Sequence, residues 1–261
     1  MSDLTIRELH ELDELQSVFA LFGEIWGAAP GSEPITVELM RALSHAGNYI
    51  AGAYRQGRLV AATAAFFGSP VGESMHSHVT GALPGHAGGF ALKLHQREWA
   101  LARGLTRITW TYDPLIRRNA YFNLAKLGGR PAEYLQTFYG TMDDAINGGD
   151  DTDRVLVAWD LNDPHVVAAA RSTPIPVPVP ADARHALYER DSLPVLGRTD
   201  GDTLLVDVPA DIEALRRTDP GAAKAWRLAL REVLGGLLAD GAHVTGFHNK
   251  TSYVVARGTS A

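Results

Sequence analysis

The 261-residue sequence contains no cysteine, which excludes disulfide bonds, thiolate nucleophiles and cysteine metal sites, and favours a reducing compartment. It has no excess of basic residues, because the formal net charge is −6, so neither nucleic acid nor an anionic membrane surface is an expected partner. No apolar run approaches the ~20 residues that a membrane span needs. The first residues, MSDLTIRELHELDEL, lack the basic and apolar segments of a secretory signal. These absences predict a soluble cytoplasmic protein.

The residues that are present have the composition of a globular protein, with 46% hydrophobic and 21% charged residues. Strand-like alternation and helix-like spacing follow each other along the chain, which predicts an α/β (α+β) fold. The segment 174–180, PIPVPVP, lacks alternate amide hydrogens and is expected to be an extended connector. We expect a domain over 1–161, a helix and connector over 162–180, and an α/β cap or lobe over 181–261 packed on the first domain. Apolar residues at helical spacing predict a helix over 220–238 in the last part.

A glycine-rich loop, LPGHAGGFA at 83–91, lies between a predicted strand over 74–83 and a predicted helix that ends near Gly104. Backbone amides at a helix start have no partner within the helix and lie at the positive end of its dipole. The loop is therefore typical of a phosphate-binding site, and a plain tight turn is the alternative. It has neither the GK[ST] of a nucleotide P-loop nor the G-x-G-x-x-G of a dinucleotide site.

The stretch His86-Ala87-Gly88-Gly89-Phe90-Ala91 resembles the pyrophosphate loop [RQ]-x-x-G-x-[GA] of the GNAT superfamily of acyl-CoA N-acyltransferases, with His86 replacing the usual Arg or Gln. The stretches LKLHQREWALARGLTRITWTYDPLIRRNAYFNLAKLGG, YLQTFYG, TDRVLVAWDL and AWRLALREVL resemble a subgroup of predicted GNAT proteins with LK-QREWA and WT-[FY]-DPL motifs. The resemblance implies a mixed, twisted sheet whose strands over 74–83 and 107–112 splay apart, followed by a C-terminal α/β extension. It also implies acetyl-CoA or another acyl-CoA, succinyl-CoA included, as the co-substrate.

The same resemblance implies where the cofactor binds: the pantetheine arm in the gap between the splayed strands, and the phosphates on the loop. In GNAT proteins an Asn in the helix after the second splayed strand contacts the cofactor. Asn119 has that position, although an Asn there also suits a helix cap. The tyrosine that usually follows as the acid is missing, and Asn123 or Leu124 lies near its place. The expected cofactor-binding residues are Gly81, Ala82, Leu83, His86, Ala87, Gly88, Gly89, Phe90, Ala91, Asn119 and Asn123.

Acyl transfer from a thioester needs an acceptor amine that has lost its proton and a proton for the departing sulfur. The candidate bases are His76 and His78, which alternate onto one face of a strand, and Asp113 at the end of the next strand. We prefer His78 because it is nearer the expected thioester, with Asp113 orienting its imidazole or taking the proton through water. Core packing of the histidines and a turn role for Asp113 are the alternatives. Tyr139 is the predicted acid, and Tyr134 and Tyr121 are the alternatives.

Arg117 and Arg118 begin the helix after the second splayed strand, where a guanidinium can bind a substrate carboxylate or the CoA phosphates, or can simply be solvated. The His-x-His pair lacks a third ligand, so no metal is expected. The predicted activity is acyl transfer to the amine of a small molecule, such as an amino acid or related metabolite, by direct attack in a ternary complex. A catalytically degenerate acyl-CoA sensor or interaction module and a protein-lysine acetyltransferase are the alternatives. A homodimer is left open.

Overall fold

The structure is a computed structural model that describes residues 4–27, 33–86, 88–140 and 150–258. The chain forms two compact units, Met1–Trp110 and Thr111–Ala261, which we call the N-terminal and the C-terminal unit. The domain boundaries predicted at 161 and 181 stay predictions. Within the described residues, no helix is both long and apolar enough to cross a bilayer.

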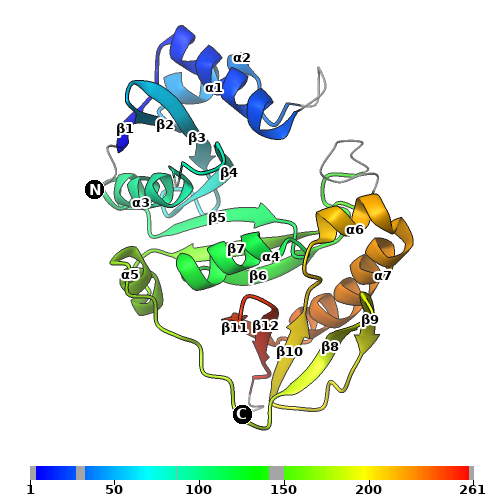
Figure 1. Cartoon of the computed structure of the whole chain (residues 1–261). Helices are drawn as coiled ribbons and strands as arrows, with labels where there is room; N and C mark the ends of the chain where they lie inside the picture. The colour runs from blue at the N-terminus through cyan, green and yellow to red at the C-terminus, as the bar shows by residue number, and fades with distance from the viewer. Residues whose placement is uncertain (1–3, 28–32, 87, 141–149, 259–261) are drawn as a thin grey trace. The chain divides into compact units, whose positions relative to one another are not determined.

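The N-terminal unit contains five neighbouring strands of a mixed sheet, in the order β1-β2-β3-β4-β5 (Figure 1). Neighbouring strands are antiparallel from β1 to β4, and β5 is parallel to β4. In chain order the elements are β1 (Leu4–Glu8), α1 (Leu12–Trp26), α2 (Val37–His45), β2 (Tyr49–Arg55), β3 (Arg58–Phe67), β4 (Ser74–Ala82), α3 (Gly88–Leu101) and β5 (Arg107–Tyr112).

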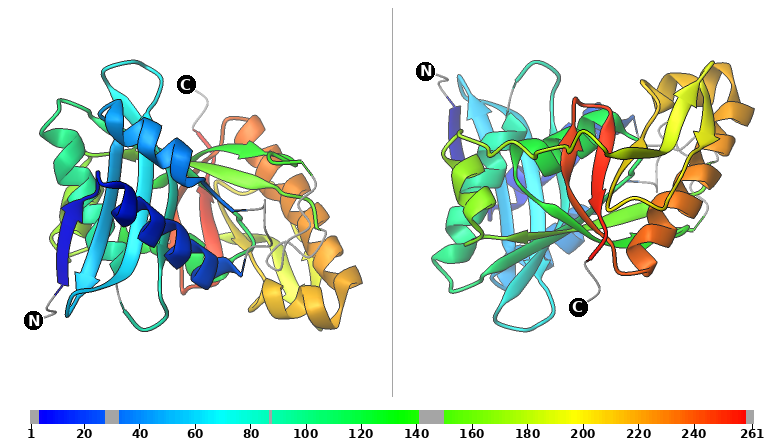
Figure 2. Two further views of the ribbon diagram at one scale, coloured as in Figure 1. Left: turned by 90° about the horizontal axis from the view of Figure 1, so that it is seen from above. Right: turned by 90° about the horizontal axis from the view of Figure 1, so that it is seen from below.

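Helices α1 and α2 cover one face of this sheet and lie across β2 and β3 (Figure 2). A capping box between Glu11 and Glu14 starts α1, and the Thr36 side chain accepts a hydrogen bond from the Leu39 N–H at the start of α2. Apolar residues at helical spacing then face the strands. The resulting core contains Leu15, Val18, Phe22, Met40, Ile50, Ala62, Ala64 and Val79.

Helix α3 lies on the other face, where small residues let it come close to the strands. A Cβ atom added to Gly88 would lie 2.7 Å from the Cβ of Ala61 in β3, so only glycine fits there without a shift. Ala61 and Ala62 are neighbours in β3, and their side chains meet α3 and the α1–α2 core respectively, as strand alternation requires. The first turn of α3 is thereby fixed against the sheet.

The C-terminal unit begins with the end of β5 and contains a second five-stranded sheet, with the order β11-β12-β10-β8-β9 (Figure 1). Strands β6 and β7 pair antiparallel in the same unit. The elements are α4 (Arg117–Ala120), η1 (Tyr121–Lys126), β6 (Arg130–Leu135), β7 (Arg154–Asp160), α5 (Pro164–Ala170), β8 (Arg184–Arg190), β9 (Leu193–Leu196), β10 (Thr203–Asp207), α6 (Ile212–Thr218), α7 (Pro220–Leu230), η2 (Arg231–Gly235), α8 (Gly236–Ala239), β11 (His243–His248) and β12 (Ser252–Ala256).

The helix predicted over 220–238 is confirmed as the continuous run of α7, η2 and α8. Its apolar face is buried through Trp226, Leu230, Val233, Leu234 and Leu237. Residues 174–180 form neither helix nor strand and lead from α5 toward β8 as the extended connector that the prolines predicted (Figure 1).

Candidate functional site

Strand β4 carries a β-bulge at His78, next to the predicted pantetheine segment. Val79 lies opposite Ala64 of β3, whereas Ser77 lies opposite the adjoining residue Ala65, so His78 is the extra residue on β4. A bulge of this kind breaks the ladder locally and redirects the side chains around it.

The bulge changes the argument for the two candidate histidines. Strict alternation, which predicted that His76 and His78 share a face, does not hold across an extra residue. The two imidazoles are still neighbours, because both contact the Phe66 ring, at centroid distances of 5.4 Å for His76 and 6.0 Å for His78. The structure therefore brings the pair together through packing on an aromatic ring.

Strand β4 also separates from β5 just before this bulge. Among the described residues, the parallel pairing of the two strands covers Ser74–His76 opposite Arg107–Thr109, whereas β4 continues to Ala82. The second half of β4 is thus the part of the strand where an extended ligand with amide groups can add to the sheet.

The direction of the β4 backbone decides which residues can serve such a ligand. Leu83 donates its N–H to the Val60 carbonyl of β3 at 2.9 Å, so Leu83 and Gly81 direct their polar backbone groups toward β3. By alternation, Ala82 and Thr80 direct theirs away from β3. Of the three predicted pantetheine contacts, Ala82 has the favourable backbone direction, and the roles of Gly81 and Leu83 stay predictions.

The predicted phosphate loop follows directly. Gly85 has a positive φ of 80°, which suits glycine, and the chain then enters α3 at Gly88. A Cβ atom at Gly89 would meet no atom within 4 Å, so the helix start is open at that position. Gly88, Gly89, Phe90 and Ala91 form the first turn, and the N–H groups of Gly88, Gly89 and Phe90 have no acceptor within the helix. Ala87 lies outside the described residues.

Two features of the loop fit an anionic ligand. The Arg55 guanidinium, at the end of β2, donates to the His86 carbonyl at 3.3 Å and so brings a positive charge to the loop. The His86 Nδ1 atom is buried without a hydrogen-bond partner among the described residues. Arg55 offers a positive charge where a loop with Arg in place of His86 would have one. Arg55 could not be assigned to the loop from the sequence, because it lies 31 residues from His86 along the chain.

His78 is held in one tautomer by a backbone carbonyl. Its Nε2 atom lies 2.9 Å from the Pro34 carbonyl oxygen. A carbonyl oxygen can only accept, so Nε2 carries the hydrogen, and in the neutral ring Nδ1 has the lone pair. This arrangement presents Nδ1 as a proton acceptor.

His76 has a different environment. Its Nδ1 atom lies 3.0 Å from the Thr109 hydroxyl of β5. Burial, together with the charges of His78 and Lys93, lowers the pKa of His76 to about 4. His76 is therefore a weaker base than an ordinary histidine, and the assignment of His78 as the base stays a prediction.

Lys93, from the LK-QREWA motif on α3, is buried with its side chain 4% exposed. Its Nζ atom donates to the Ser77 hydroxyl at 2.9 Å and to the Gln96 carbonyl oxygen at 3.1 Å, and lies 4.0 Å from the Trp110 ring centroid. None of the described carboxylates pairs with it. Burial lowers the pKa of Lys93 to about 7. Ser77 is the residue before the bulge residue His78, so this amine is hydrogen-bonded to the neighbour of the candidate base.

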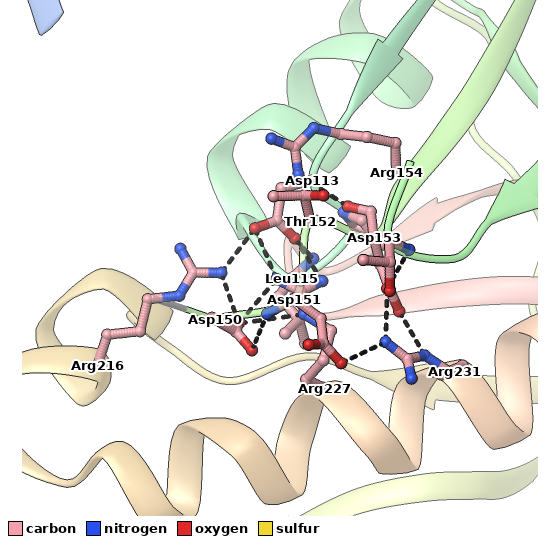
Figure 3. Close-up of polar contacts among 12 residues, drawn as sticks. Asp113, Leu115, Asp150, Asp151, Thr152, Asp153, Arg154, Arg216, Arg227 and Arg231 are labelled. Atoms are coloured by element: carbon pink, nitrogen blue, oxygen red, sulfur yellow. Dashed lines mark hydrogen bonds and ion pairs between the residues drawn. The ribbon is translucent and has the colours of Figure 1, made fainter. Parts of the chain in front are cut away.

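In the C-terminal unit, Asp113 lies in a buried cluster of acidic and basic side chains (Figure 3). Arg227 donates to Asp113 through Nη1 at 2.9 Å and through Nη2 at 2.8 Å, and Arg216 donates to it at 2.7 Å. Both arginines also contact Asp150. Beside them, Arg231 pairs with Asp151 and Asp153.

This cluster determines what Asp113 can do. Burial alone would raise the pKa of Asp113, but Arg227 and Arg216 outweigh burial and hold it well below its usual range. The Leu115 N–H adds a further donor, at 3.0 Å, so each carboxylate oxygen accepts two hydrogen bonds. A carboxylate in this state neither takes a proton near neutral pH nor has a lone pair left for an imidazole. The catalytic role of Asp113 stays a prediction that its surroundings do not favour.

Arg117 and Arg118, the predicted substrate-binding residues, form polar contacts with α6 and with the segment before it. Arg117 donates to the Val208 carbonyl at 2.6 Å, and Arg118 forms a bidentate ion pair with Glu213. Neither contact resembles an open carboxylate-binding site. Substrate binding by these residues stays a prediction without geometric support.

The remaining candidates lie in the same unit. Asn119 is inside α4, and Ile116 occupies the N-cap position, so the alternative that Asn119 caps this helix is not supported. Asn123 is buried at 5% exposure in η1. The Tyr139 hydroxyl lies 3.1 Å from the Thr111 hydroxyl, and its side chain is 42% exposed. Its exposure is compatible with the predicted acid role, which stays a prediction.

The comparisons with known proteins identify the fold. No protein-family model and no curated protein sequence matches the chain. An N-acetyltransferase from Staphylococcus aureus superposes with a TM-score of 0.50 at 14% identity, over 62% of this chain and 100% of that one. The ribosomal-protein-S18-alanine N-acetyltransferase from Escherichia coli gives 0.49 at 15% identity, over 60% and 94%. The yncA protein from Salmonella typhimurium, solved with its cofactor acetyl-CoA, gives 0.49 at 12%, over 62% and 96%.

The fold is that of the GNAT N-acetyltransferases, as the sequence resemblance predicted, and the likeness covers 62% of this chain. The α/β (α+β) class, the mixed sheet and the splayed strands are confirmed. Among the described residues, no group of three or more histidines and carboxylates is arranged to hold a metal ion.

Proposed function

We propose that the chain is an acyl-CoA-dependent N-acyltransferase that transfers an acetyl or succinyl group to the amine of a small molecule, such as an amino acid or related metabolite. The fold supports acyl transfer as the class of reaction. The resemblance of the sequence to GNAT proteins supports the small-molecule acceptor, and a cytoplasmic location is part of the same proposal.

The observation that carries the proposal is the open start of α3, next to the half of β4 that does not pair with β5. The first-turn N–H groups at Gly88 and Gly89, with Arg55 behind the loop, would bind the CoA phosphates. Thr80 and Ala82 would pair with the amides of the pantetheine arm. Bound in this way, the co-substrate supplies the activated acyl group as a thioester.

His78 would act as the general base. The amine nitrogen attacks the thioester carbonyl carbon, the nitrogen loses its proton to Nδ1 of His78, and the carbon–sulfur bond breaks. The Pro34 carbonyl holds the Nε2–H tautomer in which Nδ1 can accept. Tyr139 remains the residue proposed to protonate the thiolate.

The cofactor part of the proposal is tested with Gly89→Glu. No atom lies within 4 Å of an added Cβ at Gly89, so the variant should fold. The introduced carboxylate should repel the CoA phosphates and occupy the space next to the helix start where they would bind. We expect CoA affinity, measured by calorimetry, to fall at least 100-fold. Gly236→Glu is the matched control, because Gly236 is also helical with no atom within 4 Å of an added Cβ. Unchanged affinity in a folded Gly89→Glu protein would contradict the assignment.

Turnover is tested by release of free thiol from acetyl-CoA and succinyl-CoA with a panel of amino acids and other small amines. Release that depends on one amine supports the enzyme and names the acceptor. Tight acyl-CoA binding with the thioester left intact would instead identify a sensor, and acylation of lysine in a peptide would identify a protein acetyltransferase.

The base is tested with His78→Ala. We expect turnover to fall by roughly 100-fold, the usual effect of losing a general base, with acyl-CoA affinity nearly unchanged. His45→Ala, an exposed histidine at the end of α2, is the control. Full activity with an unchanged pH profile in His78→Ala would rule out this role.

A further inference from the structure

A cavity of about 260 Å³ in the C-terminal unit has no part in the acyl-transfer proposal. Its walls come from η1, α5, the proline connector and the turn between β11 and β12. The residues on which the argument depends are Leu124, Arg130, His165, Ile175, Phe247 and His248.

Glycines let these walls come together. A Cβ atom at Gly246 of β11 would lie 2.3 Å from a Val177 methyl group, so the connector is seated on the hairpin only because Gly246 has no side chain. Gly128, with a φ of +74°, would place a Cβ 3.1 Å from the His165 carbonyl. Pro174 and Pro176 stiffen the connector in its extended form. The cavity is thus a built feature of this unit.

The charge of the lining is one-sided. Among the residues that the structure describes, Arg130, His165 and His248 line the cavity and no Asp or Glu does, in a chain whose formal net charge is −6. Within the same residues, the Arg130 guanidinium uses one of its five donors, in a hydrogen bond to the Thr245 carbonyl at 3.3 Å. Neither imidazole bonds to another described side chain.

The same bias continues beyond the cavity. An adjoining hollow shares Arg130, His165, Val177 and Thr245, adds His243, and again has no acidic lining residue. On the η1 side, the Lys250 and Lys126 amines lie 5.1 and 5.8 Å from the centroid of the Tyr121 ring, which lines the cavity. The described lining of the cavity and of this adjoining hollow therefore favours an anion over a cation.

We infer that this cavity binds a small monocarboxylate with an apolar body. A guanidinium matches a carboxylate through two parallel hydrogen bonds, and Arg130 has the donors for them. Leu124, Ile175 and Phe247 offer apolar surface to the rest of the molecule. The volume is small for a ligand pocket, so it suits a small metabolite. The inference does not depend on the acyl transfer.

The test uses three compounds of the same size and different charge: 3-phenylpropionate, its neutral amide and 3-phenylpropylamine. Binding to the full chain is measured by calorimetry at low salt. We expect the acid to bind at least 10-fold more tightly than the amide, and the amine not to bind. Equal affinity for acid and amide would overturn the inference.

Two variants locate the site. Arg130→Gln should weaken binding of the acid at least 10-fold, whereas Arg171→Gln, an exposed arginine just after α5, should not. Ala125→Leu narrows the cavity while leaving Arg130 in place, and should weaken binding of the acid as well. If Arg130→Gln fails to fold, Ala125→Leu decides alone. Unchanged affinity for the acid in the folded variants would overturn the inference.

Discussion

Each unit of the chain buries positive charge, and the two units surround it differently. In the N-terminal unit, Lys93 has a hydroxyl, an amide oxygen and an indole ring as neighbours. In the C-terminal unit, Arg227, with a side chain 0% exposed, meets the carboxylates of Asp113 and Asp150. No described carboxylate pairs with the first charge, whereas the second contacts two carboxylates.

The difference separates a group that can lose its charge from one that cannot. Burial makes the charged form of Lys93 unfavourable, and its pKa of about 7 lets it release its proton in the physiological range. Burial acts in the same direction on Arg227, but Asp113 and Asp150 outweigh it and raise the pKa of Arg227 above its usual value. The charges of the C-terminal cluster therefore do not change near neutral pH. Lys93, in contrast, can titrate there, and it donates to Ser77, the residue before the candidate base His78.

Breaking the paired cluster should have the largest effect. Arg227→Met removes two guanidinium contacts to each carboxylate and leaves buried negative charge that Arg216 alone must compensate. We expect a loss of about 3–5 kcal/mol in the free energy of unfolding, measured in urea. Arg118→Met, which breaks the exposed pair with Glu213, should cost no more than about 1 kcal/mol. Similar losses in both variants would mean that the buried cluster has no special weight.

Removing the charge of Lys93 should increase the free energy of unfolding, whereas breaking the arginine cluster should decrease it. The lowered pKa of Lys93 means that the unfolded chain, where lysine titrates near 10.4, holds more protons than the folded one between about pH 7 and 10. Stability of the wild type should therefore rise with pH across this window, by up to about 1.4 kcal/mol per pH unit.

Lys93→Met should abolish that rise and be the more stable protein at pH 7, with the difference shrinking toward pH 10. Urea unfolding at a series of pH values measures both. Ser77 and Gln96 keep their mutual hydrogen bond of 3.1 Å in the variant. A wild-type profile that is flat from pH 7 to 10 would show that Lys93 stays charged in the folded state.

The same two sites show what the sequence can and cannot predict. The glycine loop and the helix over 220–238 could be predicted because they depend on local residue types at fixed spacing, whereas the splayed strands were implied by the resemblance to GNAT proteins. The partners of Asp113 were not, because Arg216 and Arg227 lie 103 and 114 residues away in the chain. Lys93 was visible only as part of a motif, since lysine is rarely buried without a partner. The bulge at His78 has no local sequence signal such as a glycine. Regular alternation of side chains was therefore assumed along the whole strand, which predicted that His76 and His78 share a face.

The smallest expected effect concerns the hydroxyl that accepts from Lys93. Ser77→Ala removes the Oγ acceptor at 2.9 Å and leaves Gln96 and the Trp110 ring around the amine. A hydrogen bond to a charged donor is stronger than one to a neutral donor, so the charged form of Lys93 loses more than the neutral form. We expect the variant to lose about 1.5–3 kcal/mol of unfolding free energy at pH 6, where Lys93 is charged, and less at pH 9. Ser17→Ala, an exposed serine on α1, should cost the same at both pH values. A loss in Ser77→Ala that does not change with pH would mean that Lys93 has the same charge at pH 6 and pH 9, and the contrast with the paired arginines would then fail.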